Sequence, residues 1–172
     1  MSKTNISVNT EDFEKFAKRL EQVVDKDLQR EVKLWLEGSG FQFLEEVQRM
    51  IKTMQVVDTR RLLNSFTRGG DGTIWRLSSN GLSLEVGTNV NYARYVNDGH
   101  WTDDPSRGRA SRFVPGVWQG NSFRYIKGHN EGMVLKLQYI EGRPYFDNAV
   151  TVFRAIFERS MGTKLNEWVR RL

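Results

Sequence analysis

The sequence contains no cysteine, and only three prolines and two histidines among its 172 residues. The lack of cysteine excludes disulfides, thiolate zinc sites and cysteine nucleophiles, and it suits a reducing cytoplasm. No apolar run approaches the roughly 20 residues that a membrane span needs, and the first residues lead into no apolar segment of signal-peptide length. These absences predict a soluble protein that is made in the cytoplasm and does not enter a membrane.

The composition predicts a folded, basic protein. Hydrophobic residues make up 38% of the chain and aromatic residues 12%, which excludes wholesale disorder. The formal net charge is +5, and the excess of basic residues lies in the second half. Such a balance permits contact with nucleic acid or with an acidic partner, and it equally describes a solvated basic surface.

Apolar residues recur at helical spacing in the first part of the chain. The first predicted amphipathic helix covers residues 10–24, and a second covers residues 28–54. Gly38 and Gly40 interrupt the second pattern and disfavour a helix by about 2 kcal/mol together. Because the apolar period resumes in phase after them, we expect one long, bent helix.

Two further helices are predicted. A short one follows a turn in which Asp58 or Thr59 serves as the cap, and its inward edge includes Leu62 and Phe66. The last helix begins at Pro144, a residue suited to a first helical turn, and its long amphipathic face continues nearly to the C-terminus.

Strand signals lie between these helices. Residues 73–78 and 82–86 alternate in polarity around Asn80-Gly81, which predicts a tight β-hairpin. Residues 101–142 contain aromatic-rich, strand-like segments separated by glycines, and we interpret them as an inserted arm or loop region. The predicted fold class is α+β, with N-terminal helices, a small antiparallel sheet with a Gly/aromatic-rich arm and a long C-terminal amphipathic helix. Residues 1–172 form a single structural domain in this interpretation.

The stretch of residues 85–100 connects the hairpin to the arm. It begins as a strand that we expect to break at Gly87, and it continues as one short helical turn. Tyr92, Tyr95 and Val96 are expected to pack inward, and a glycine at position 99 ends the turn. Truncating either tyrosine should therefore cost a few kcal/mol, whereas loss of the neighbouring His100 should have little effect.

The sequence contains few residue patterns that are typical of catalytic or metal-binding sites. His100 and His129 have carboxylates nearby in sequence, so a metal site is conceivable, but their separation matches no local metal motif. Asp98 and the pair Asp103-Asp104 have Gly, Pro or Ser as close neighbours, which favours turns over acid–base catalysis. No G-x-S-x-G frame and no phosphate-binding glycine loop is present. We therefore predict no catalytic, cofactor or metal site.

Aromatic residues alternate with arginine in the arm. This pattern could stack nucleic-acid bases, or it could pack the arm against the body or a neighbouring subunit. We favour packing, and together with the apolar face of the last helix it gives a predicted subunit interface of Arg112, Phe113, Trp118, Phe123, Tyr125, Phe153, Phe157 and Trp168.

Three blocks of sequence, in order, resemble the tailed-phage tail-component family typified by the tenth gene product of a lambdoid coliphage. Residues 57–66 resemble its V-D-T-G-x-L-x-x-S block, residues 87–100 its G-T-x-x-x-Y-A-x-Y-V-E-x-G-T block, and residues 143–149 its R-P-F-x-x-P-A block. The residues that carry this structural signature are Asp58, Thr59, Leu62, Ser65, Gly87, Tyr92, Ala93, Tyr95, Val96, Gly99, Arg143, Pro144 and Phe146. The form of these blocks and the Gly/Trp-rich insertion look most like members from Gram-positive prophages and phage-like particles.

The sequence departs from the family pattern at three positions. Arg60 stands where glycine is usual, so we expect the turn not to rely on a left-handed glycine. Asn97 stands where an acidic residue is usual, and Asn148 where a proline is common.

The resemblance implies a virion structural protein of the head–tail neck or the head-proximal tail end, acting in tail completion or head–tail joining. It implies synthesis in the host bacterial cytoplasm, no enzyme activity and no cofactor. The expected partners are further copies of the chain in a ring, a hexamer that matches the tail, and neighbouring neck, connector or tail proteins, with weak DNA contact. Two alternatives stay open: a basic DNA-binding module in DNA packaging or passage, and a tail terminator ring subunit.

Overall fold

The computed structural model describes residues 26–56 and 60–170. The chain divides into two compact units, Met1–Asn97 with Arg143–Leu172, here called the body, and Asp98–Gly142, here called the arm. The helix expected over residues 10–24 and the cap expected at Asp58 or Thr59 lie outside the described residues. The mixture of helices and small antiparallel sheets confirms the α+β class.

Helix α2 (Lys26–Thr53) is continuous through both of its glycines, as the in-phase pattern predicted. A Cβ at Gly40 would lie 2.6 Å from Cδ2 of Leu84 and 2.8 Å from Cη2 of Trp75, whereas a Cβ at Gly38 would meet nothing within 4 Å. The hairpin therefore approaches the helix too closely at Gly40 to leave room for a larger side chain.

The C-terminus of α2 is closed by a residue in the left-handed conformation. Gln55 has φ +53°, the N–H of Val56 donates to the Ile51 carbonyl (2.9 Å), and the N–H of Gln55 donates to the Lys52 carbonyl (3.1 Å). This is a Schellman-type ending, which satisfies carbonyls that the helix itself leaves open.

Helix α3 (Arg61–Asn64) begins after an arginine in the left-handed conformation. Arg60 is its N-cap, with φ 59° and ψ −9°, and makes no side-chain capping bond. The turn therefore does use a left-handed residue, although arginine has a Cβ that disfavours this conformation.

Strands β1 (Thr73–Leu77) and β2 (Leu84–Thr88) form the predicted antiparallel hairpin. The strand does not break at Gly87, because Gly87 pairs with Ile74 and the ladder continues to its last pair, Thr73 with Thr88. Trp75 packs on the Phe41 ring of α2 at 4.9 Å, and the Arg68 guanidinium lies over both rings. This cluster holds the hairpin against α2.

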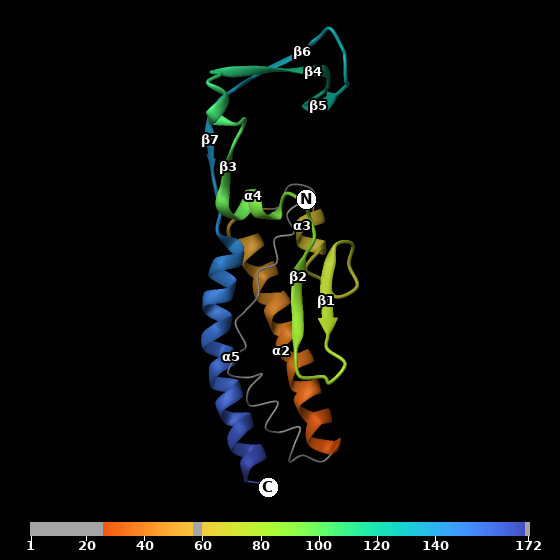
Figure 1. Ribbon diagram of the computed structural model, residues 1–172, viewed down its shortest axis with the longest axis vertical. Coiled ribbons are helices and arrows are strands. Elements are labelled where there is room, and N and C mark those ends of the chain that lie inside the picture. Colours follow the sequence, from red (N-terminus) through yellow and green to blue (C-terminus); the bar gives the residue numbers. More distant parts are fainter. Residues whose placement is uncertain (1–25, 57–59, 171–172) are drawn as a thin grey trace. The chain divides into compact units, whose positions relative to one another are not determined.

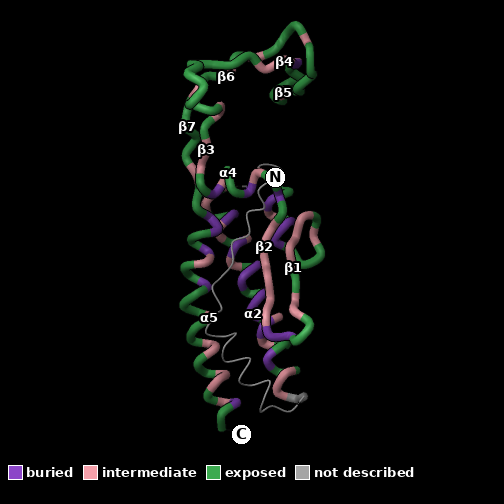
Figure 2. Tube along the Cα trace, in the orientation of Figure 1, coloured by how far each residue is buried: buried purple, intermediate pink, exposed green. Residues whose placement is uncertain are grey.

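Helices α4 (Ala93–Asp98) and α5 (Tyr145–Val169) complete the body. α5 runs beside α2, and the buried residues lie where these helices and the hairpin meet (Figures 1 and 2). One core cluster surrounds Phe43, Val47 and Phe66, and a second joins Val32 to Trp168.

The arm contains the remaining strands: β3 (Gly99–Trp101), β4 (Ser111–Gln119), β5 (Ser122–Tyr125), β6 (Gly132–Lys136) and β7 (Tyr139–Glu141). β3 pairs with β7, and β4 is the central strand of a three-stranded antiparallel sheet in the order β5-β4-β6. A 3₁₀ turn, η1 (Pro105–Arg107), lies in the predicted polar loop.

Candidate functional site: the arm and its root

The signature blocks meet in the body where the chain leaves for the arm and returns from it, a region we call the arm root. The N–H of Arg143 donates to the Val96 carbonyl (2.8 Å). The Oδ1 of Asn97 accepts from the N–H of Phe146 (2.9 Å), and its Nδ2 donates to Oδ2 of Asp147 (2.7 Å). Asn97 thus supplies the acceptor for an amide in the first turn of α5, a group that the helix leaves without an internal partner.

The arm root is also tied to α2 and to the start of α4. Nη1 of Arg143 donates to the carbonyls of Met54 (3.2 Å) and Gln55 (2.7 Å) at the end of α2. A basic side chain is favourable at a helix C-terminus because of the helix dipole. The hydroxyl of Tyr145 donates to the Ala93 carbonyl (3.2 Å) from a buried position. The arginine and aromatic residues of the closing block therefore join α2, α4 and α5.

The first block has a structural role as well. Ser65 is fully buried, and its hydroxyl donates to the Leu62 carbonyl (2.8 Å). The hydroxyl of Thr88 donates to Ser65 Oγ (2.8 Å) and accepts from the N–H of Val90 (3.1 Å). These bonds link α3 to the end of β2, so Ser65 and Thr88 fix the backbone there.

The expectation that Tyr92 and Tyr95 both pack inward is half right. Tyr92 and Val96 pack against the core, but Tyr95 is 55% exposed, so the prediction that it packs inward is wrong. Tyr92 and Val96 are four positions apart and share one face of the turn, whereas Tyr95 is rotated by about 100° from Val96 and meets solvent. Arg94 is exposed as well.

Strands β3 and β7 form the first part of the arm. Gly99 ends α4 as predicted, with φ +80°, and a Cβ there would lie 2.6 Å from the Ile140 carbonyl oxygen. The hydroxyl of Tyr139 donates to the Asp98 carbonyl (2.8 Å), and its ring packs edge-on against Trp101 at 5.5 Å. Position 99 therefore requires glycine for both conformation and space.

The two faces of the β5-β4-β6 sheet differ in composition. Residues paired across a ladder share a face, so the registers assign every side chain of the sheet. We call one side the aromatic face; it consists of Arg112, Val114, Gly116, Trp118, Phe123, Tyr125, Met133 and Leu135. We call the other side the cationic face; it consists of Ser111, Phe113, Pro115, Val117, Gln119, Ser122, Arg124, Gly132, Val134 and Lys136.

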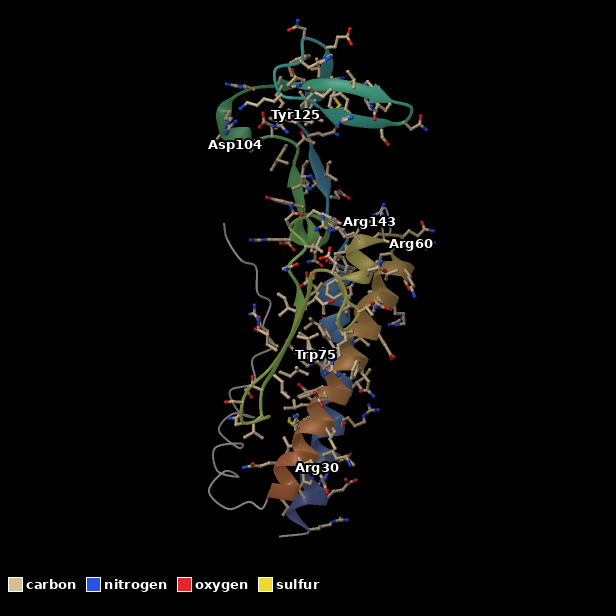
Figure 3. The ribbon with its side chains drawn as sticks, turned by 90° about the vertical axis from the view of Figure 1, so that its right-hand side faces the viewer. Arg30, Arg60, Trp75, Asp104, Tyr125 and Arg143 are labelled. Carbon is tan, nitrogen blue, oxygen red and sulfur yellow. The ribbon has the colours of Figure 1, made fainter. Side chains whose placement is uncertain are left out.

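The aromatic face has large exposed side chains. Trp118 and Tyr125 are 59% and 60% exposed, and Trp118 packs edge-on against Phe123 at 5.3 Å. Tyr125 is drawn on the arm in Figure 3. No apolar side chain of residues 98–142 belongs to the buried core of the described residues, so the sheet has little interior of its own.

The predicted interface residues separate into two groups. Arg112, Phe113, Trp118 and Tyr125 are exposed, and Phe123 is half-buried. Phe153 and Trp168 are instead buried in the body, and Phe157 packs with Trp35 at 5.0 Å. The apolar face of α5 packs on α2 of the same chain and covers Phe153 and Trp168 within the body, whereas an interface at Phe157 stays a prediction.

Among the described residues, no three His, Cys, Asp or Glu side chains gather where they could hold a metal ion. Nδ1 of His129 accepts from the N–H of Glu131 (3.1 Å), a local turn contact. Hydrogen bonds from the Ser106 hydroxyl and N–H hold the pKa of the Asp104 carboxyl below its usual value, in the turn that caps η1. Within the described ranges, no helix is both apolar enough and long enough for a membrane span.

Asn97 and Gly40 make contacts that the sequence patterns did not predict. Asn97 looked like the end of a turn, and its bond to the N–H of Phe146 joins positions 49 apart. Gly40 looked like a helix interruption, and its contact with the hairpin depends on tertiary structure. Only the departure of Asn97 from the acidic residue usual in the family marked it.

Comparison with known proteins agrees with the signature blocks. A family model described as "Bacteriophage HK97-gp10, putative tail-component" matches residues 14–99. The chain is 43% identical over 158 residues to the uncharacterized protein YqbI of Bacillus subtilis (strain 168), which covers 91% of this chain and 95% of that protein. It is 40% identical over 153 residues to the phage-like element PBSX protein XkdI of the same strain, and the alignment covers 89% of this chain and 92% of that protein. No solved structure matches. The chain belongs to the HK97 gp10-like family of phage tail components.

Proposed function

We propose that the chain is a structural subunit of the head–tail neck or the head-proximal tail end, where it completes the tail or joins it to the head. Its partners in this proposal are further copies of itself in a ring, and neighbouring neck, connector or tail proteins. Membership of a tail-component family supports a structural role in the virion. The similarity to a protein of a phage-like element supports the same class of particle.

The observation that carries the proposal is the exposed aromatic face of the arm. A unit as small as residues 98–142 is marginal unless a partner covers its apolar surface, because small units bury too little of it themselves. Trp, Tyr and Arg dominate the binding energy of protein interfaces, and the aromatic face combines Trp118, Tyr125 and Arg112. Burial of this face against a neighbour accounts for its exposure in the single chain.

A ring follows from the same surface. An arm that docks on a different part of the next subunit makes a heterologous contact, and such contacts close into a ring when the rotation closes. We propose six copies, to match the tail. The molecular mass of the oligomer extracted from particles tests the number of copies in the ring. A mass of six chains supports the proposal, and a mass of another whole number of chains corrects that number.

The decisive experiment removes the gene from the phage or phage-like element that encodes the chain. Electron microscopy of the induced lysate should show heads and complete tails that remain separate, and the wild-type gene supplied in trans should join them. Absence of tails would assign the chain to tube assembly, and tails of uncontrolled length would assign it to tail termination. Normal particles would contradict the proposal.

A matched pair of variants tests the aromatic face in that assay. Trp118→Ser/Tyr125→Ser should fold, because both side chains are exposed, and should fail to restore joined particles. Val152→Ser/Ile156→Ser removes two exposed apolar side chains from α5 in the body and should restore them. Equal complementation by the two double variants would remove the aromatic face from the proposal.

A further inference from the structure

We propose that the cationic face of the arm sheet binds the phosphate backbone of double-stranded DNA. The three strands of the sheet contain Arg112, Arg124 and Lys136, and they contain no Asp or Glu. The registers place Arg124 and Lys136 together on the cationic face. This inference stands independently of the proposed function, which uses the opposite face.

The two cations are available to a ligand. Arg107, in the nearby turn, lies 3.6 Å from Asp104 and 4.0 Å from Asp103, which offset its charge. Arg124 and Lys136 are exposed and form no ion pair with any residue that the structure describes. Their charge is therefore unbalanced locally, and a polyanion is the complementary ligand.

Neutral hydrogen-bonding side chains accompany both cations. Ser111 lies opposite Lys136, and Ser122 lies opposite Gln119, close to Arg124 on the same strand. Hydroxyl and amide side chains beside Lys and Arg are the usual ligands of DNA phosphates, and they position a duplex without reading its sequence. The two ends of the cationic face therefore have side chains suited to DNA phosphates, and the exposed Phe113 and Val134 lie between them.

The separation of the cations favours a duplex over an acidic protein. Lys136 pairs with Ser111 and Arg124 with Val117, so their positions lie about 20 Å apart along β4 at the usual rise of a strand. Duplex DNA carries a charge about every 1.7 Å of its axis, so it presents phosphates to both cations wherever it lies. An acidic protein would need two carboxylates at one fixed separation.

The position of the aromatic residues favours a duplex over a single strand. Single-stranded DNA is held by successive bases stacked on aromatic rings. Phe113 is the one aromatic residue on the cationic face, and its ring packs over Gly132, where a Cβ would lie 2.7 Å from the ring. Trp118, Phe123 and Tyr125 lie on the other face. The cationic face therefore offers one aromatic ring, Phe113, and not the row of rings that successive stacked bases need.

The test measures fluorescence anisotropy of a labelled mixed-sequence duplex titrated with the full chain at several salt concentrations. We expect binding at about 50 mM salt, and a slope of log affinity against log salt of about −2, since two phosphates are neutralised. Arg124→Gln/Lys136→Gln should weaken binding at least ~10-fold and bring the slope close to zero. Arg124→Lys/Lys136→Arg keeps both charges and should retain binding.

The control is Arg154→Gln/Arg159→Gln on exposed positions of α5, which removes the same net charge from the body. It should leave the slope unchanged. Absence of binding at about 50 mM salt would overturn the inference, because backbone contacts are strongest at low salt. Equal losses in the two Gln variants would also overturn it and assign binding to net charge. The chain could instead bind single-stranded DNA more tightly than the duplex and lose that binding in Trp118→Ser/Tyr125→Ser. This result would overturn the inference and assign DNA binding to the aromatic face.

Discussion

The side-chain amide of Asn97 donates a 2.7 Å hydrogen bond from Nδ2 to Oδ2 of Asp147. Asn97 is buried, so both of its polar atoms need partners, and its Oδ1 accepts from the N–H of Phe146. An acidic residue at this position could accept the second bond but could not donate the first unless it were protonated. The hydrogen-bonding groups at the end of α4 and at the start of α5 are therefore complementary in this chain.

Asn97→Asp should lower the free energy of unfolding by about 1–3 kcal/mol, because it replaces a buried hydrogen bond by two facing carboxylates. Adding Asp147→Asn restores a donor and should recover most of the loss. Urea denaturation of the wild type, both single variants and the double variant gives the coupling energy. Independent, additive effects would show that the two side chains do not act together.

Arg60→Gly should raise the free energy of unfolding by about 0.5–1 kcal/mol. Arg60 has φ 59°, a conformation that disfavours residues with a Cβ by about 1–2 kcal/mol, and the flexibility of glycine in the unfolded chain offsets part of the gain. Arg60→Ala retains the Cβ and should change the free energy little. Thermal and urea denaturation would contradict this reading if the glycine variant were the less stable of the two.

Replacing each of the two glycines of α2 by alanine should change the free energy of unfolding in opposite directions. Gly38→Ala should stabilise by about 1 kcal/mol through helix propensity, since a Cβ there meets nothing within 4 Å. Gly40→Ala should destabilise by about 1 kcal/mol, because displacing Leu84 and Trp75 outweighs the same propensity gain. Denaturation midpoints that move in the same direction for both variants would show that the hairpin does not constrain Gly40.

Local patterns in the sequence predicted the helices and the hairpin, but not what their residues touch. The apolar period of α2 continued in phase across Gly38 and Gly40, so the long helix could be inferred. The difference between these glycines depends on the hairpin, far away in the sequence. The apolar face of α5 was recognised from its spacing, but spacing does not state whether α2 or a neighbouring subunit covers Phe153 and Trp168.

Tyrosine truncations in and around the arm root should rank by burial. Tyr145 is 1% exposed and Tyr145→Ala should cost about 3–5 kcal/mol. Tyr92→Ala should cost less, since Tyr92 is only partly buried. Tyr95→Ala should change the free energy of unfolding by no more than about 0.5 kcal/mol, as for most surface substitutions. A loss for Tyr95→Ala as large as that for Tyr145→Ala would contradict the exposed position of Tyr95.

Site-specific cross-linking in assembled particles tests whether the aromatic face of the arm contacts a neighbouring subunit. A photoreactive phenylalanine at Tyr125 reports on the aromatic face, and the same residue at Ile156, also exposed, reports on the body. We predict that irradiation joins the Tyr125 variant to a second copy of the chain or to another neck or tail protein, with far weaker products from Ile156. Particles that contain the chain but give no cross-link from Tyr125 would contradict the account.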